Sequence, residues 1–133
     1  MSLQIDQYSP EAMLGAKIGH MRDGGKVTQI TNRSTGVTLN SISGSITTDT
    51  TSLAAGASAE FTVTNSHVFT DDVIVVSQQS GSSNVAGVAG TTHVNVVTVA
   101  NGSFIISVDN KSTTTAETGA IIINFLVMKA AQV

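Results

Sequence analysis

The sequence contains no cysteine, no tryptophan and a single proline, and only 11% of its residues are charged. Without cysteine, the chain has neither disulfides nor thiolate ligands for a metal. With one tyrosine and four phenylalanines, its core must consist mainly of aliphatic side chains. The charged fraction is well below the roughly 25% of an ordinary domain. Serine, threonine, asparagine and glycine replace the charged residues, which suits a β-rich protein that functions in an assembly.

Basic residues are missing over a long stretch. No lysine or arginine occurs from Ser34 to Asn110, and the net charge is −3. Because nucleic-acid binding needs clustered basic side chains that replace counterions, nucleic acid is not an expected partner. No apolar run approaches the ~20 residues of a membrane span, and no signal peptide is visible. We therefore expect no membrane partner, and synthesis in a host cytoplasm.

The most apolar stretch runs from Gly119 to Lys129, and its β-branched residues favour a strand. Its residues alternate between a face of Ile121, Ile123, Phe125 and Val127 and a face of Ala120, Ile122, Leu126 and Met128. A strand that is apolar on both faces cannot lie on a solvated sheet. One face is predicted to enter the core. For the other we predict a homo-oligomer interface at Ile122, Leu126 and Met128, with a covering segment of the same chain as the alternative.

Turn signals at intervals of roughly 8–12 residues separate the other strand candidates. These candidates are 26–32, 37–40, 42–47, 59–65, 72–79, 91–100 and 103–110. Asn101-Gly102 predicts a type I′ hairpin turn, and Gly44 marks a bulge or a close approach. The pattern predicts an all-β fold, a β-sandwich or jelly roll of seven or eight antiparallel strands, with a small closed barrel as the alternative.

Residues 1–25 differ from the rest and predict an extended N-terminal arm before a β-body of residues 26–133. Ser9-Pro10-Glu11 has the residues of a helix start, and Gly24-Gly25 is typical of a hinge. The arm carries seven sizeable apolar side chains: Leu3, Ile5, Tyr8, Met13, Leu14, Ile18 and Met21. Ordering 25 residues costs more conformational entropy than burying these side chains returns. The arm is therefore expected to need a partner surface.

Candidate catalytic and metal-binding groups are few. The three histidines, His20, His67 and His93, lack the HxH or HxxxH spacing that brings two imidazoles to one metal. His67 precedes Asp71-Asp72, where a hard-cation site is conceivable, but a solvated acidic turn is the simpler interpretation. The sequence has no GxSxG elbow and no phosphate loop ending in GK[ST]. We expect no enzyme activity, no metal and no cofactor.

The strand-and-turn pattern of residues 25–130 resembles that of small virion proteins of tailed bacteriophages. The stretches that carry this resemblance are 26–40, 44–47, 53–65, 72–76 and 123–130. The resemblance implies a capsid decoration, or cement, protein. Such proteins are β-rich and often trimeric, and they sit on the outer surface of the head between capsomers. They clamp neighbouring major capsid proteins, frequently with an N-terminal arm.

We therefore expect a structural virion protein that stabilises the phage head from the outer surface of the capsid. Its expected partners are the major capsid protein, bound through the seven apolar residues of the arm, and further copies of the same chain in a trimer. Two alternatives stay open. One is a tail, neck or fibre-base β-module. The other is a host receptor or glycan-binding module with its site in the loops Thr48–Ser58, Ser80–Gly90 and Lys111–Thr118.

Overall fold

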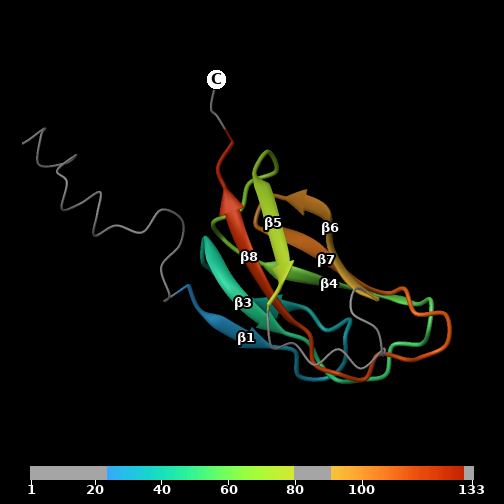
Figure 1. The fold of residues 1–133 in the computed structure, drawn as a ribbon. Coiled ribbons are helices and arrows are strands. Elements are labelled where there is room, and N and C mark those ends of the chain that lie inside the picture. The colour runs from blue at the N-terminus through green and yellow to red at the C-terminus, as the bar shows by residue number, and fades with distance from the viewer. Residues whose placement is uncertain (1–23, 80–90, 131–133) are drawn as a thin grey trace, which may run out of the picture.

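The computed structural model describes residues 24–79 and 91–130. Within these ranges the protein is all-β, without a helix, and its strands form two four-stranded sheets (Figure 1). No helix of the described part could therefore span a membrane. The predicted arm lies outside the described residues as far as position 23. In chain order the strands are β1 (Lys26–Thr28), β2 (Val37–Thr38), β3 (Ser43–Thr47), β4 (Ser58–Thr64), β5 (Val73–Gln78), β6 (Thr92–Ala100), β7 (Ser103–Asn110) and β8 (Ile122–Met128).

The strand order is β1-β3-β8-β5 in the first sheet and β2-β4-β7-β6 in the second. The expectation of an entirely antiparallel body is wrong for two pairs, because β1 pairs with β3 and β2 pairs with β4 in parallel. The physical reason is that the first four strands alternate between the two sheets. The connection from β1 to β3, like that from β2 to β4, is therefore a crossover and not a hairpin. Parallel pairing requires such a crossover.

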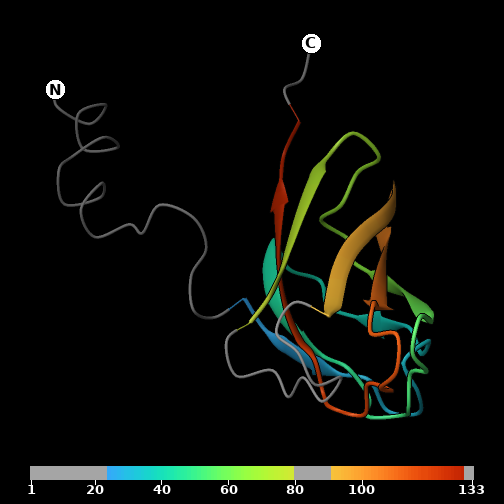
Figure 2. The same ribbon diagram turned by 45° about the vertical axis from the view of Figure 1, so that its right-hand side comes forward.

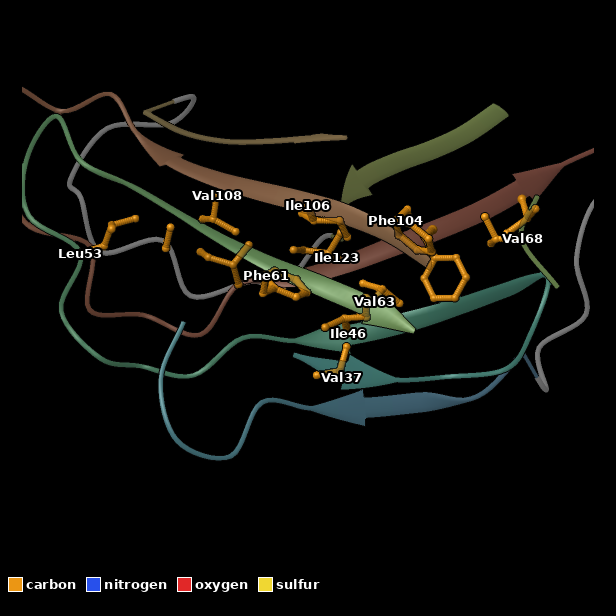
Figure 3. Close-up of a cluster of buried hydrophobic side chains, with 14 residues drawn as sticks. Val37, Ile46, Leu53, Phe61, Val63, Val68, Phe104, Ile106, Val108 and Ile123 are labelled. Atoms are coloured by element: carbon orange, nitrogen blue, oxygen red, sulfur yellow. The ribbon is translucent and has the colours of Figure 1, made fainter. Parts of the chain in front are cut away.

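The two sheets face each other across one apolar core, as Figure 2 shows from the side. Both sheets contribute alternate residues to it, in the period of two that strands impose. Phe104 of β7 and Phe125 of β8 meet at its centre, with ring centroids 5.4 Å apart and planes tilted by 60°. Figure 3 shows the other members, among them Ile46, Phe61, Val63, Ile106 and Val108.

β8 lies inside the first sheet, hydrogen-bonded to β3 on one side and to β5 on the other. The predicted inner face is confirmed, since Ile121, Ile123, Phe125 and Val127 are all buried. On the opposite face Ile122 and Leu126 are half-buried and Met128 is exposed. The two-faced pattern of this strand therefore places one face in the core and the other on the outside of the sheet.

Gly44 of β3 is a close-approach position and not a bulge. The β3–β8 ladder has no register shift there. A Cβ at Gly44 would lie 2.5 Å from Leu39 Cδ2 and 2.9 Å from Phe125 Cε1, inside van der Waals contact. The position has no side chain because those two side chains fill the space over it.

The turn at Asn101-Gly102 joins β6 and β7 as predicted, but it is not of type I′. That type needs positive φ at both central residues, and only Gly102, with φ of 83°, has one. The turn is hydrogen-bonded to residues that follow β4, in the loop between β4 and β5. Thr70 N donates to Asn101 Oδ1 at 2.9 Å, Gly102 N donates to Val68 O and Asn65 N donates to Gly102 O, both at 2.8 Å.

We predict opposite consequences for two neighbouring isoleucines of β8. Ile123→Ala removes a fully buried side chain from the core and should lower the free energy of unfolding by about 2–5 kcal/mol. Ile122→Ala, on the outer face, should lower it by less than about 1 kcal/mol. Urea unfolding of both variants measures the difference. Equal losses would show that the two faces of β8 are buried alike.

Candidate functional site

Apolar side chains gather on the outer face of the first sheet. Val73 is 55% exposed, Val75 44% and Met128 51%. The registers place Val73 opposite Met128 and Val75 opposite Leu126, so these side chains stand in adjacent pairs on one face. We call this set, with Ile122 further along β8, the outer patch: Val73, Val75, Ile122, Leu126 and Met128.

The second sheet has a different outer face. The outward positions of β4 are Ser58, Glu60, Thr62 and Thr64, all exposed, and they alternate with buried residues. That alternation is typical of a sheet with one face in water. The outer face of β4 is therefore polar, whereas the outer face of the first sheet is apolar where β5 begins and β8 ends. Large exposed apolar patches on soluble proteins mark interaction sites, which makes the outer patch the candidate functional surface.

A depression of about 440 Å³ lies beside the outer patch. Its floor is a row of polar residues across the sheet, with Ser45 opposite Asn124 and Asn124 opposite Ser77. Leu126 and Val75 form a wall along one side of this row. Small side chains next to larger apolar ones make the sheet locally hollow, and Gly24 and Gly25 lie at the β1 end of the hollow.

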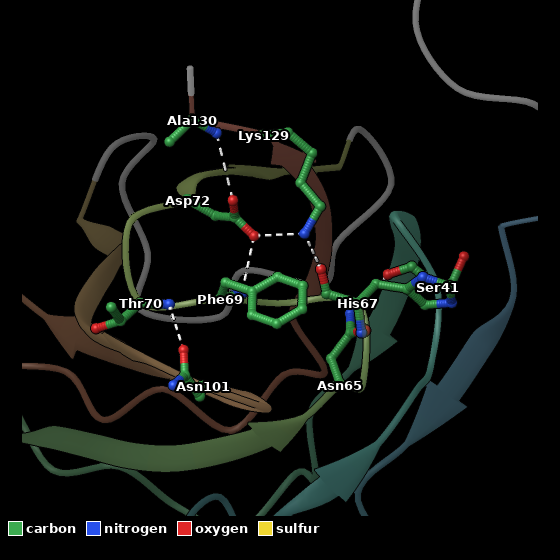
Figure 4. A network of polar contacts seen from close by, with 9 residues as sticks. All are labelled: Ser41, Asn65, His67, Phe69, Thr70, Asp72, Asn101, Lys129 and Ala130. Carbon is green, nitrogen blue, oxygen red and sulfur yellow. Dashed lines mark hydrogen bonds and ion pairs between the residues drawn. The ribbon is translucent and has the colours of Figure 1, made fainter. Parts of the chain in front are cut away.

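An ion pair stands at the end of β8, where β5 begins (Figure 4). Lys129 Nζ donates to Asp72 Oδ2 at 2.6 Å and to the carbonyl of His67. Phe69 N donates to the same carboxylate oxygen at 2.8 Å. Lys129 Nζ also lies 4.5 Å from the centroid of the exposed Phe69 ring, within the range of a cation–π contact. Lys129, paired with Asp72, thus contacts the exposed ring of Phe69 at the end of the first sheet.

The aspartate of this ion pair is hidden, since its side chain is only 3% exposed. Hydrogen bonds from Lys129 and from the N–H of Phe69 hold the pKa of Asp72 below its ordinary value. The prediction of a solvated acidic turn therefore fits Asp71, which is exposed, and is wrong for Asp72. The lysine that pairs with it lies 57 positions away in the sequence, so no local pattern reveals the pair.

The structure assembles no metal site from the candidate residues. Within residues 24–79 and 91–130, no three histidine or acidic side chains form a group that could hold a metal ion. Next to His67, the position that a cation could take is occupied by the ammonium group of Lys129. His93 lies on the exposed side of β6, and His20 lies outside the described residues.

Arg33 lies between the strand candidates 26–32 and 37–40 and is not among the predicted site residues, but its side chain is buried and joins several loops. Its guanidinium donates to Thr48 Oγ1 at 3.1 Å, to Glu117 O at 3.2 Å and to Gly119 O at 2.8 Å. Burial lowers the pKa of Arg33, and the charges of Glu117 and Asp49 oppose that shift. In the sequence Arg33 is only the last of four basic residues before the stretch from Ser34 to Asn110 that has none, which does not reveal its burial.

Two of the loops proposed for a glycan site do lie together. Leu53 and Glu117 exchange backbone hydrogen bonds of 2.9 and 2.8 Å, and Asn110 Nδ2 donates to Leu53 O at 3.0 Å and to Thr115 O at 2.9 Å. The buried polar groups of these loops thus bind each other. The third loop, Ser80–Gly90, lies outside the described residues.

Fold and surface together define a class, an all-β protein of two facing mixed sheets with an apolar patch on the outer face of one of them. No protein-family model matches the chain, and neither the curated proteins nor the solved structures include a significant match.

We predict that Asp72→Asn lowers the melting temperature at pH 7, whereas Asp71→Asn leaves it nearly unchanged. Because the folded-state pKa of Asp72 lies below that of the unfolded chain, its ionised form stabilises the fold above about pH 4. This stabilisation is lost as the pH falls through the lower, folded-state pKa. Melting curves of both variants from pH 7 to acid should therefore differ above pH 4 and converge below it. Curves that stay parallel would contradict the ion pair.

Proposed function

We propose that the protein is a structural subunit of a phage virion, a decoration subunit that stabilises the head from the outer surface of the capsid. In this role it binds further copies of itself and the major capsid protein. The observation that carries the proposal is the cluster of exposed apolar side chains in the outer patch, among them Val73, Val75 and Met128, set against the polar outward row of β4. A protein that acts alone in water gains nothing from half-exposed valine and methionine side chains in paired rows.

The outer patch is the proposed contact between copies. Val73 and Met128 form an exposed apolar pair at the end of the sheet. In a closed oligomer of identical chains, each copy hides the same residues. Three copies agree with the resemblance to decoration proteins. The predicted interface residues Ile122, Leu126 and Met128 all belong to this face.

The low charge of the body supports a role inside an assembly. Isolated sheet proteins guard their edge strands with lysine, proline or bulges. β5 is an edge of the first sheet, and its six residues Val73–Gln78 include neither charge nor proline. β6, an edge of the second sheet, has a register shift between Val96 and Thr98, which is such a guard. The less guarded edge thus belongs to the sheet that carries the outer patch.

The finer architecture is part of the proposal. Two facing four-stranded sheets around one core favour a β-sandwich over a closed barrel. The jelly-roll form, which consists of Greek keys, receives no support from the two parallel pairs. In this proposal the arm, residues 1–25, binds the capsid, with Leu3, Ile5 and Tyr8 among its contact residues.

We predict that charges in the outer patch dissociate the oligomer. The double variant Val73→Asp/Met128→Asp buries two carboxylates in the proposed contact, which costs several kcal/mol unless they are paired. Light scattering should find the wild type as an oligomer and this variant at the 13.6 kDa of one chain. The matched control Thr62→Asp/Thr64→Asp changes two exposed positions of the second sheet and should remain oligomeric. A wild type that is itself a single chain would overturn the proposed contact.

We predict that deletion of residues 2–16 abolishes binding to phage heads while the melting temperature and the oligomeric state are kept. The deletion removes Leu3, Ile5, Tyr8, Met13 and Leu14 and leaves the body intact. Co-sedimentation with heads assembled without the protein is the measurement, with the full chain as control. Binding in hundreds of copies per head supports decoration. A small fixed number per virion would instead favour the tail, neck or fibre-base alternative, and retained binding after the deletion would refute the arm hypothesis.

A further inference from the structure

The hydrogen-bond pattern of β5, an edge strand, shows which of its backbone groups face the free edge. Gln79 N donates to Ile122 O at 2.7 Å, which continues the register of the β5–β8 ladder. In an antiparallel ladder, pairs that exchange hydrogen bonds alternate with pairs that do not. Every second residue of β5, counted back from Gln79, therefore turns its backbone groups to β8. The residues between them turn theirs to the free edge: Ile74, Val76 and Gln78.

The backbone groups on this free edge are unpaired in the described part of the chain. Within residues 24–79 and 91–130, no hydrogen bond uses the N–H or the C=O of Ile74, Val76 or Gln78. The side chains of Ile74 and Val76 pack against the core and are only half-buried. The edge thus presents backbone donors and acceptors next to aliphatic side chains that are incompletely covered.

The other edges of the described sheets are shorter or irregular. β1 has three residues and β2 has two. β6 has nine, but its ladder shifts register between Val96 and Thr98. The β5–β8 ladder has no such shift, and β5 contains neither charge nor proline. Regular, uncharged edges are the ones on which further strands assemble, so β5 is the edge best suited to accept another strand.

We propose that β5 pairs in antiparallel orientation with β5 of a second copy, so that the first sheets of two molecules join into one sheet. Val76 then lies opposite Val76 of the second copy, and Ile74 lies opposite Gln78 of the second copy. Residues in such pairs exchange both of their hydrogen bonds, so the unpaired backbone groups of both edges are satisfied. The pairing also covers the half-buried Ile74 and Val76. Because β5 has no charge, two identical edges meet without repulsion.

The edge and the outer patch can be used at the same time, because the patch lies on the face of the sheet. Each copy has one β5 edge, so this pairing joins copies two at a time. A single short pair of strands is marginal by itself. An oligomer held together by its outer patches presents several β5 edges, and their pairings reinforce one another. The inference therefore rests on the proposed contact between copies, and it does not require a virion role.

Proline substitution on the free edge tests the inference. Val76→Pro removes an N–H that faces away from β8, so it blocks the new ladder and spares the β5–β8 hydrogen bonds. Light scattering should find half the wild-type mass for this variant. The matched control is Val94→Pro on β6, a valine that is also half-buried against the core. Because Lys111 N donates to Thr91 O in the β6–β7 ladder, the N–H of Val94 also faces a free edge. This control should keep the wild-type mass.

The masses separate a failure of this inference from a failure of the outer-patch contact. If Val76→Pro and the wild type have equal masses, both above the 13.6 kDa of one chain, the edge pairing is overturned and the outer-patch contact stands. A wild type of 13.6 kDa would overturn both contacts.

Amide hydrogen exchange of the wild type supplies a measurement without substitutions. In the oligomer, the N–H groups of Ile74, Val76 and Gln78 should exchange several-fold more slowly than that of Val94, which we expect to remain unpaired. Dilution until single copies remain should remove the difference. Equally fast exchange at all four positions of the oligomer would overturn the inference. Protection that appears only after phage heads are added would assign the edge to a segment of another protein and would also overturn it.

Discussion

One constraint dominates this structure, the placement of an apolar strand between two neighbours. β8 is hydrogen-bonded to β3 and β5 along its length, so its backbone polar groups are satisfied within the sheet. Its inner side chains join the facing sheet through the contact of Phe125 with Phe104. Apart from Asn124, its outer side chains are apolar, and they form part of the outer patch. Both proposals concern contacts of the sheet that contains β8.

The thin core is supported by buried polar groups. Few large apolar side chains are available, so the loops at the ends of the sheets depend on hydrogen bonds. Arg33 joins three loops through carbonyl and hydroxyl oxygens, and Asn110 joins two. Asn65 acts similarly near the other end, where its Nδ2 donates to Ser41 O at 2.6 Å. These side chains all have acceptors, which offsets the free-energy cost of their burial.

The outer patch and the depression beside it call for different occupants. Val73 and Met128 present broad aliphatic surface, which matches an equally apolar surface on another copy. The row of Ser45, Asn124 and Ser77 presents hydrogen-bonding groups in a narrow hollow, which matches an extended backbone.

The sequence by itself determined which residues face the core, because the alternation along a strand is a local property. The inward sets of β4, β7 and β8 follow directly from their period of two, and so does the two-faced nature of β8. Tertiary structure alone decided the parallel pairs, the turn at Asn101-Gly102, the ion pair of Asp72 with Lys129 and the buried position of Arg33. Each of these depends on groups far apart in the chain. Their energies arise only once two sheets have met, so no local pattern encodes them.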